Sequence, residues 1–184
     1  LLPFEEAKLY GHNAIHAMLA YIGSAKGLKK MTELSDYDDI MATARNAFID
    51  ESGGALIKKY SKLGEPLFTV DGYTSYADDL LERMTNPFLQ DAVARAARDP
   101  MRKLSPNDRV FGTMNLAVEF GIEPVYMGVG ALAGVLYVAR GEGDFELPAG
   151  LAADKLGDLD DNKIRKILEF LWSGQSEQSA GRLI

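Results

Sequence analysis

Signals that start and stop helices punctuate this chain of 184 residues, and they constrain its fold more than any other feature. Asn86-Pro87 and Ser105-Pro106 each place a capping side chain directly before proline, an arrangement typical of a helix start. Ser35-Asp36-Tyr37-Asp38-Asp39 places acidic residues at another start, where the helix dipole is positive. Asp99-Pro100 ends the helix before it. The apolar stripes that follow these signals have helical spacing, so the sequence predicts an all-α, multi-helical fold.

These boundaries predict both the helices and the loops between them, within a single domain across residues 1–184. The expected helices cover residues 5–23, about 38–60 with a kink at Gly53-Gly54, 75–84, 88–98, 105 to about 120, 124–140 and 162–172. Residues 63–72 are expected to form a loop with a short extended piece at 67–70, and residues 141–150 a loop before the terminal helix. The tail 173–182 is expected to be polar and frayed.

The first predicted helix has one polar side. Residues 8–17 read Lys-Leu-Tyr-Gly-His-Asn-Ala-Ile-His-Ala and contain both histidines of the chain. The polar residues of this stretch are Lys8, His12, Asn13 and His16. At roughly 100° per residue, they fall within about 140° of the helix circumference, and the opposite side is apolar. We therefore expect this helix to lie between the core and a polar cleft, and the chemistry of the chain to lie in that cleft.

A second cluster is cationic, although the chain as a whole carries a net charge of −7. Its members are Arg95, Arg98, Arg102, Lys103 and Arg109. One interpretation is a solvated helix face. The other is a site for an anion, because guanidinium groups match carboxylate or phosphate oxygens. The acidic balance of the whole chain argues against a nucleic-acid partner.

Two patterns suggest a cofactor or a metal, and each has a simpler explanation. Gly128, Gly130 and Gly134 have the spacing of a dinucleotide fingerprint, but Glu123-Pro124 directly upstream leaves no room for the strand that this motif requires. We expect these glycines to let two helices pack closely. His12 and His16 have the i, i+4 spacing of a helical metal pair, but without an evident third ligand we expect no metal.

The remaining bulk features favour the cytoplasm and exclude a membrane protein. The longest weakly polar run, residues 124–139, is shorter than the roughly 20 apolar residues of a membrane span. No secretory signal opens the chain. The chain has no cysteine, so a disulfide scaffold and a thiolate metal site are excluded.

Four stretches, in chain order, carry a resemblance to a known family. They are Lys8-x4-Asn13-x2-His16 with Ala17–Gly23, Glu51–Tyr60, Asn86–Asp91, and Arg95-x2-Arg98-Asp-Pro-Met-Arg-Lys-Leu104 with Asn107-Asp-Arg109. Together they resemble the polyol-specific long-chain dehydrogenase/reductase, or mannitol dehydrogenase, family, and most of all its members that oxidise mannitol 1-phosphate. The resemblance spans roughly residues 5–140.

Members of that family bind NAD(H) in an N-terminal Rossmann domain and the substrate in a helical C-terminal domain. The resemblance implies that this chain is the second domain alone, with the Rossmann domain outside residues 1–184 and with no metal. It implies that Lys8 is the general acid/base and that the N–H groups of Asn13 and His16 hold the reacting oxygen. It also implies that Arg95 and Lys103 contact the substrate.

Three further residues are substrate-binding candidates on weaker grounds. Arg98 and Arg102 follow only from the cation cluster, and His12 departs from the family pattern. The expected reaction interconverts a sugar alcohol, mannitol 1-phosphate, and its ketose, fructose 6-phosphate. Two alternatives remain: a hexuronate (fructuronate or tagaturonate) reductase of the same family, and a non-enzymatic helical binding module.

Overall fold

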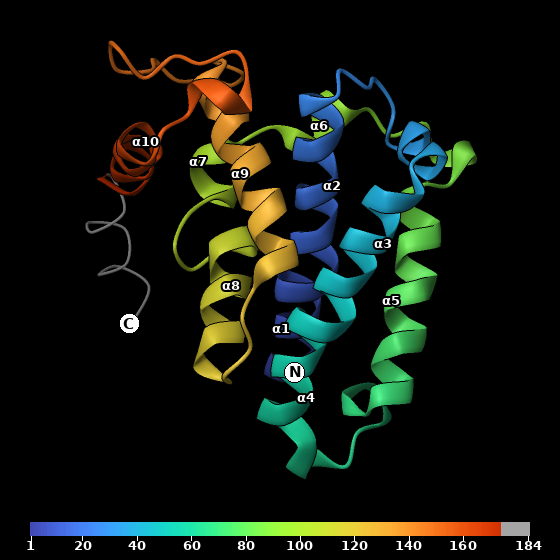
Figure 1. Ribbon diagram of the computed structural model, residues 1–184. Helices are drawn as coiled ribbons and strands as arrows, with labels where there is room; N and C mark the ends of the chain where they lie inside the picture. Colours follow the sequence, from blue (N-terminus) through green and yellow to red (C-terminus); the bar gives the residue numbers. More distant parts are fainter. Residues whose placement is uncertain (174–184) are drawn as a thin grey trace.

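A computed structural model describes residues 1–173, and within this range the chain is all-α with no β-strand, as predicted (Figure 1). The α-helices are α1 (Leu2–Glu6), α2 (Ala14–Ala25), α3 (Asp38–Asn46), α4 (Gly54–Tyr60), α5 (Val70–Met84), α6 (Val93–Ala97), α7 (Pro100–Lys103), α8 (Arg109–Glu119), α9 (Val125–Ala139) and α10 (Asp161–Ser173). Short 3-10 turns lie at Met31–Asp36, Ser61–Leu63, Pro66–Phe68, Pro87–Leu89 and Leu156–Asp158.

Two wider π-helical segments join helices into continuous rods. Ala7–Asn13 connects α1 to α2, and Ala47–Gly53 connects α3 to α4, with helical backbone angles at both Gly53 and Gly54. A Cβ atom on Gly11 would lie 2.8 Å from the ring of Phe48 and 2.7 Å from the hydroxyl of Tyr73. The close neighbours of Gly11 are therefore two aromatic side chains.

Helix α2 lies at the centre of the fold and packs against α6, α8 and α9 (Figure 1). A Cβ atom on Gly130 would lie 2.5 Å from Met18, and one on Gly134 would lie 2.7 Å from Leu104. These contacts confirm the prediction of close packing for Gly130 and Gly134, whereas the same prediction for Gly128 is wrong, because a Cβ atom there would meet nothing within 4 Å. The buried carboxylate of Glu51 accepts hydrogen bonds from the first amides of α9, at 2.6 and 2.8 Å.

The middle of the chain departs from the sequence prediction at two places. The prediction of an extended piece at residues 67–70 is wrong. Thr69 accepts a hydrogen bond from the amide of Gly72 and so caps α5, which begins at the next residue. The prediction of one helix over residues 88–98 is also wrong, because only the residues of α6 are α-helical in that range. Gln90 has a left-handed φ of 48°, and Lys30 forms an isolated antiparallel bridge with Ala92. This bridge places Asp91 just before α6.

The later helices and loops largely match their predicted places. Helices α9 and α10 and the end of α8 agree with prediction to within a residue or so, and a loop follows α9 across residues 141–150. The predicted start of α8 at Ser105-Pro106 is wrong, because these residues form a turn and Asp108 caps the helix at Arg109. The predicted frayed tail beyond residue 173 lies outside the described residues. Across the described range, every helix is too short or too polar to cross a membrane.

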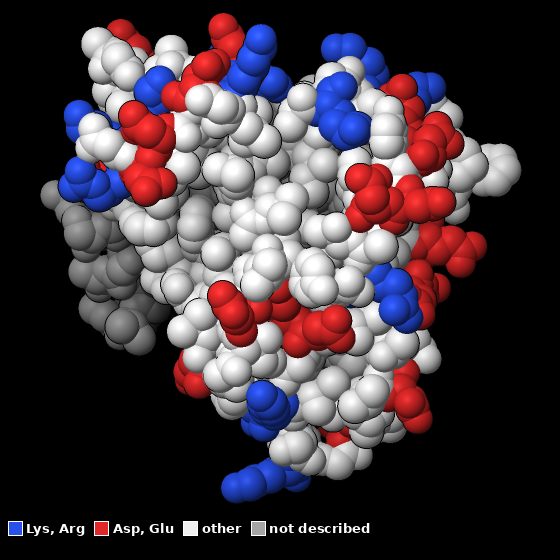
Figure 2. All heavy atoms as spheres, in the orientation of Figure 1, with Lys and Arg blue, Asp and Glu red and all other residues white. Residues whose placement is uncertain are grey.

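One face of the molecule, over α3 and α9, has an uncharged centre (Figure 2). Exposed apolar side chains of α9 include Val125, Val129 and Leu132. Around the rim of this face, Lys and Arg alternate with Asp and Glu. The view therefore shows no continuous basic surface of the kind that nucleic-acid binding requires.

Candidate active site

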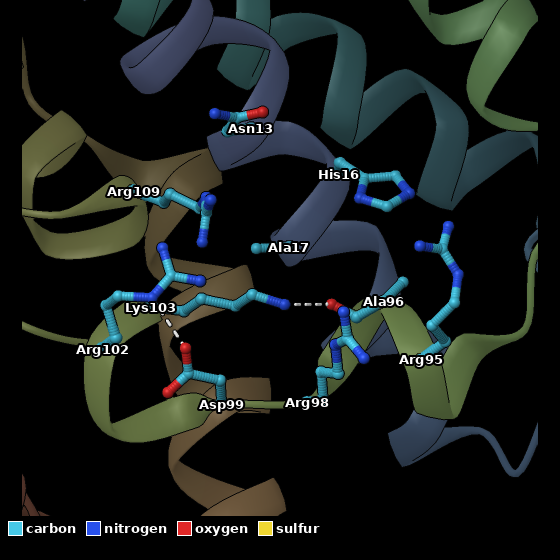
Figure 3. Close-up of a pocket in the computed structure, with 10 residues that line it drawn as sticks. All are labelled: Asn13, His16, Ala17, Arg95, Ala96, Arg98, Asp99, Arg102, Lys103 and Arg109. Carbon is cyan, nitrogen blue, oxygen red and sulfur yellow. Dashed lines mark hydrogen bonds and ion pairs between the residues drawn. The ribbon is translucent and has the colours of Figure 1, made fainter.

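A pocket of about 410 Å³ opens beside the start of α2, between that helix and the segment from α6 to α8 (Figure 3). Asn13, His16 and Ala17 form the wall on the side of the first helical rod. The opposite wall contains all the residues of the predicted cation cluster, Arg95, Arg98, Arg102, Lys103 and Arg109, together with Ala96 and Asp99. Its volume suits a small polar molecule.

The structure separates the polar residues of the first rod into two groups. Asn13 and His16 line the pocket, whereas Lys8 and His12 are not among its lining residues. Lys8 is exposed. The ring of His12 lies 6.4 Å from the ring of His16, and burial lowers the pKa of His12, with further lowering by His16, Arg83 and Lys8. Lys8 and His12 therefore lie beyond the edge of the pocket.

His16 is held by a carboxylate that the sequence prediction did not include among the site residues. Its Nε2 lies 3.1 Å from Oδ2 of Asp91, and Oδ1 of the same carboxylate pairs with Nη2 of Arg95 at 2.7 Å. Burial lowers the pKa of His16, although Asp91 partly offsets this effect. The only sequence signal for Asp91 was its place in the Asn86–Asp91 stretch, since 75 residues separate it from His16.

Lys103 is the buried member of the cation cluster. It is 9% exposed, and its Nζ donates a hydrogen bond to the carbonyl of Ala96 at 2.6 Å (Figure 3). Burial lowers its pKa to about 8, and the neighbouring Arg109 and Arg102 act in the same direction. The surroundings of Lys103 therefore stabilise the charged form of its side chain less than water does.

Positive charge exceeds negative charge around the pocket. Among the described residues, three of the five cations, Arg95, Arg102 and Arg109, form ion pairs with Asp91, Asp99 and Asp108. Five cations against three carboxylates leave an excess of two positive charges. Arg102 is 2.7 Å from Asp99. Nη1 of Arg109 is buried without a hydrogen-bond partner in the part of the chain that the structure describes. An anion with two negative charges, such as a phosphate monoester, would balance this excess.

The two sequence patterns that suggested a metal or a dinucleotide do not form a site for either group within the described residues. Between residues 1 and 173, no three histidine, aspartate or glutamate side chains are grouped to hold a metal ion. Gly130 and Gly134 contact Met18 and Leu104 inside the packed core, so the glycine pattern of α9 does not fit a pyrophosphate.

The fold and the pocket together define an all-helical domain with a polar, cation-lined pocket. Residues 1–144 match the mannitol dehydrogenase C-terminal domain, and the chain belongs to this oxidoreductase family. The family resemblance inferred from the four sequence stretches is confirmed.

Curated relatives agree with this assignment. The chain is 36% identical over 137 residues to mannitol-1-phosphate 5-dehydrogenase of Caldanaerobacter subterraneus subsp. tengcongensis, an alignment that covers 74% of this chain and 34% of the relative. It is 35% identical over 137 residues to the enzyme of the same name from Brevibacillus brevis, with the same coverage. For the Bacillus licheniformis enzyme, the identity is 35% over 130 residues, covering 71% and 32%. The chain thus spans about a third of the length of these relatives.

Proposed function

We propose that this chain is the substrate-binding and catalytic domain of an NAD-dependent dehydrogenase that interconverts mannitol 1-phosphate and fructose 6-phosphate. The observation that carries this proposal is the pocket itself, in which an amide and an imidazole face a wall with two excess positive charges. The names of the curated relatives support the same substrate. We further propose that the cofactor binds to a Rossmann domain N-terminal to residue 1, and the share of each relative that this chain spans supports this division.

The residues of the first helical rod would handle the reacting oxygen. Oxidation of a secondary alcohol removes a hydride from carbon and a proton from oxygen, and the nicotinamide would accept the hydride. In this proposal Lys8 takes the proton during oxidation and returns it during reduction. Asn13 donates its amide hydrogens to the reacting oxygen and stabilises the negative charge that develops there. His16 binds the substrate next to Asn13, and His12, which lies beyond the edge of the pocket, would contact only a part of the substrate that extends past that edge.

The cation wall would bind the phosphate. Arg95, Arg98, Arg102, Lys103 and Arg109 line it. Nη1 of Arg109 lies 3.8 Å from Oδ1 of Asp108 and donates no hydrogen bond within the described residues, so it would keep a hydrogen to donate if a phosphate oxygen reached it. A hexuronate carries a single carboxylate and would leave one of the two excess charges unbalanced. The charge count therefore favours a phosphorylated polyol over a hexuronate.

The test uses the full-length protein and a panel of mannitol 1-phosphate, mannitol, fructuronate and tagaturonate with either nicotinamide cofactor. We expect mannitol 1-phosphate to be the best substrate. Lys8→Ala is expected to lower kcat by about 100-fold or more with a smaller change in KM, because general acid/base groups contribute on this scale. Lys166→Ala, an exposed lysine on α10, is the matched control.

Three results would contradict the proposal. Equal use of mannitol and its phosphate would reject the role of the cation wall. Full turnover by Lys8→Ala would remove that residue from catalysis. Absence of turnover with every substrate would favour a helical module that binds without catalysing a reaction.

A further inference from the structure

The carboxylate of Asp91 holds two walls of the pocket together. Its Oδ2 lies 3.1 Å from Nε2 of His16 on the first helical rod. Its Oδ1 accepts a hydrogen bond from Nε of Arg95 at 2.9 Å and forms an ion pair with Nη2 of the same residue at 2.7 Å. The side chain is only 13% exposed, so little water competes for these bonds. One carboxylate therefore sets the positions of an imidazole and a guanidinium that both line the pocket.

The backbone around Asp91 is itself held in place. The carbonyl of Asp91 accepts a hydrogen bond from the amide of Met31 at 2.9 Å, and the amide of Val93 donates to the carbonyl of Lys29 at 3.0 Å. These bonds flank the isolated bridge between Lys30 and Ala92. The position of the carboxylate thus depends on two backbone contacts, and not only on its own side-chain rotamer.

The contact with Asp91 determines which nitrogen of His16 carries the proton. Burial lowers the pKa of His16, so its ring is neutral near pH 7; Asp91 acts in the opposite direction, and Lys103 and Arg95 lower the pKa further. A carboxylate only accepts hydrogen bonds, so Nε2 of the neutral ring must be the nitrogen with hydrogen. Nδ1 is then an acceptor. In Figure 3 the second ring nitrogen of His16 lies on the side of the pocket.

An acceptor at Nδ1 changes the role of His16. The hydrogen of the reacting hydroxyl goes to Lys8 in the proposed reaction, and its oxygen accepts from Asn13. A hydroxyl on a neighbouring carbon of the polyol has a hydrogen to donate, and Nδ1 can accept it. The sequence prediction, in which His16 donates an N–H to the reacting oxygen, would require a protonated ring in this arrangement.

We propose that Asp91 is a positioning residue that fixes the Nε2–H form of His16, so that Nδ1 accepts a hydrogen bond from a substrate hydroxyl next to the reacting carbon. The same carboxylate holds Arg95 in the cation wall. The part of this inference that concerns the substrate rests on the proposed function, whereas the part that concerns the proton on His16 does not.

The experiment compares Asp91→Asn with Asp78→Asn in the full-length protein. Asp78 is a matched control, since it pairs with Arg45 through both oxygens on an exposed surface. The amide that Asp91→Asn introduces can donate to Nε2, which would move the ring hydrogen to Nδ1 and remove the acceptor. We expect KM for mannitol 1-phosphate to rise about 10- to 100-fold in Asp91→Asn, the scale for losing the carboxylate partner of a functional histidine, with a smaller fall in kcat.

A second measurement is independent of activity. Histidine-selective ¹⁵N NMR of the full-length protein, with the His16 signal assigned by His16→Gln, is expected to show the Nε2–H form in the wild type. Asp91→Asn is expected to lower the pKa of His16, because the carboxylate raises it. An Nδ1–H form in the wild type would overturn the inference, as would a KM for Asp91→Asn equal to that of Asp78→Asn. If the wild type uses no polyol, the proposed function fails, and the spectrum still decides the role of Asp91.

Discussion

Lys103 is expected to make anion binding depend on pH in the alkaline range. Its side chain is buried, its Nζ donates to the carbonyl of Ala96, and its pKa is lowered to about 8 by burial and by the nearby Arg109 and Arg102. The amine therefore loses its charge well below the ordinary lysine pKa. Since the phosphate of a sugar phosphate is already doubly charged above neutral pH, only the protein side of this contact changes.

The size of the effect follows from one charged contact. A hydrogen bond to a charged group contributes about 1.5–3 kcal/mol. At about 1.4 kcal/mol per factor of ten, the neutral amine should bind fructose 6-phosphate roughly 10- to 150-fold more weakly than the ammonium. The direction of the change follows from the charge on Lys103. The affinity for fructose 6-phosphate is highest below the pKa of Lys103, where the ammonium is charged, and it falls by up to about tenfold per pH unit above that pKa.

Isothermal titration of the full-length protein with fructose 6-phosphate measures this affinity without interference from the chemical step. Lys103→Arg keeps its charge and should bind with no weakening near pH 8, whereas Lys103→Met should bind weakly at every pH. Lys166→Met is the control and should reproduce the wild-type profile. A wild-type affinity that stays constant through this range, or a Lys103→Met variant that keeps the pH dependence, would refute the reasoning.

Two further predictions concern stability and use urea unfolding. Gly130→Ala places a Cβ atom 2.5 Å from Met18 and should lower the free energy of unfolding by about 1–3 kcal/mol, whereas Gly128→Ala meets nothing within 4 Å and should be neutral or stabilising. Equal effects would contradict the packing argument. Glu51→Gln removes one of two oxygens that accept from the first amides of α9 and should cost about 1–3 kcal/mol, with exposed Glu119→Gln as the control. A cost no larger than that of the control would show that these bonds contribute little.

The helical fold was largely predictable because its signals are local. Caps, prolines and apolar stripes act within a few residues, and they located α9, α10 and the end of α8 closely. The prediction for residues 88–98 was wrong because a contact with residues 29–31 replaces the first part of the expected helix. No local pattern in either segment announces that pairing.

The sequence by itself determined the helical class, the polar side of the first rod and the presence of a cation cluster, since each depends on spacing within one segment. Only the tertiary structure decided that Asn13 and His16 face this cluster while Lys8 lies beyond its edge, and that Asp91 joins His16 to Arg95. It also decided the burial of Lys103, and with it the lowered pKa. The physical reason is that desolvation and charge pairing depend on which distant segments close around a side chain, whereas helix formation depends on its immediate neighbours.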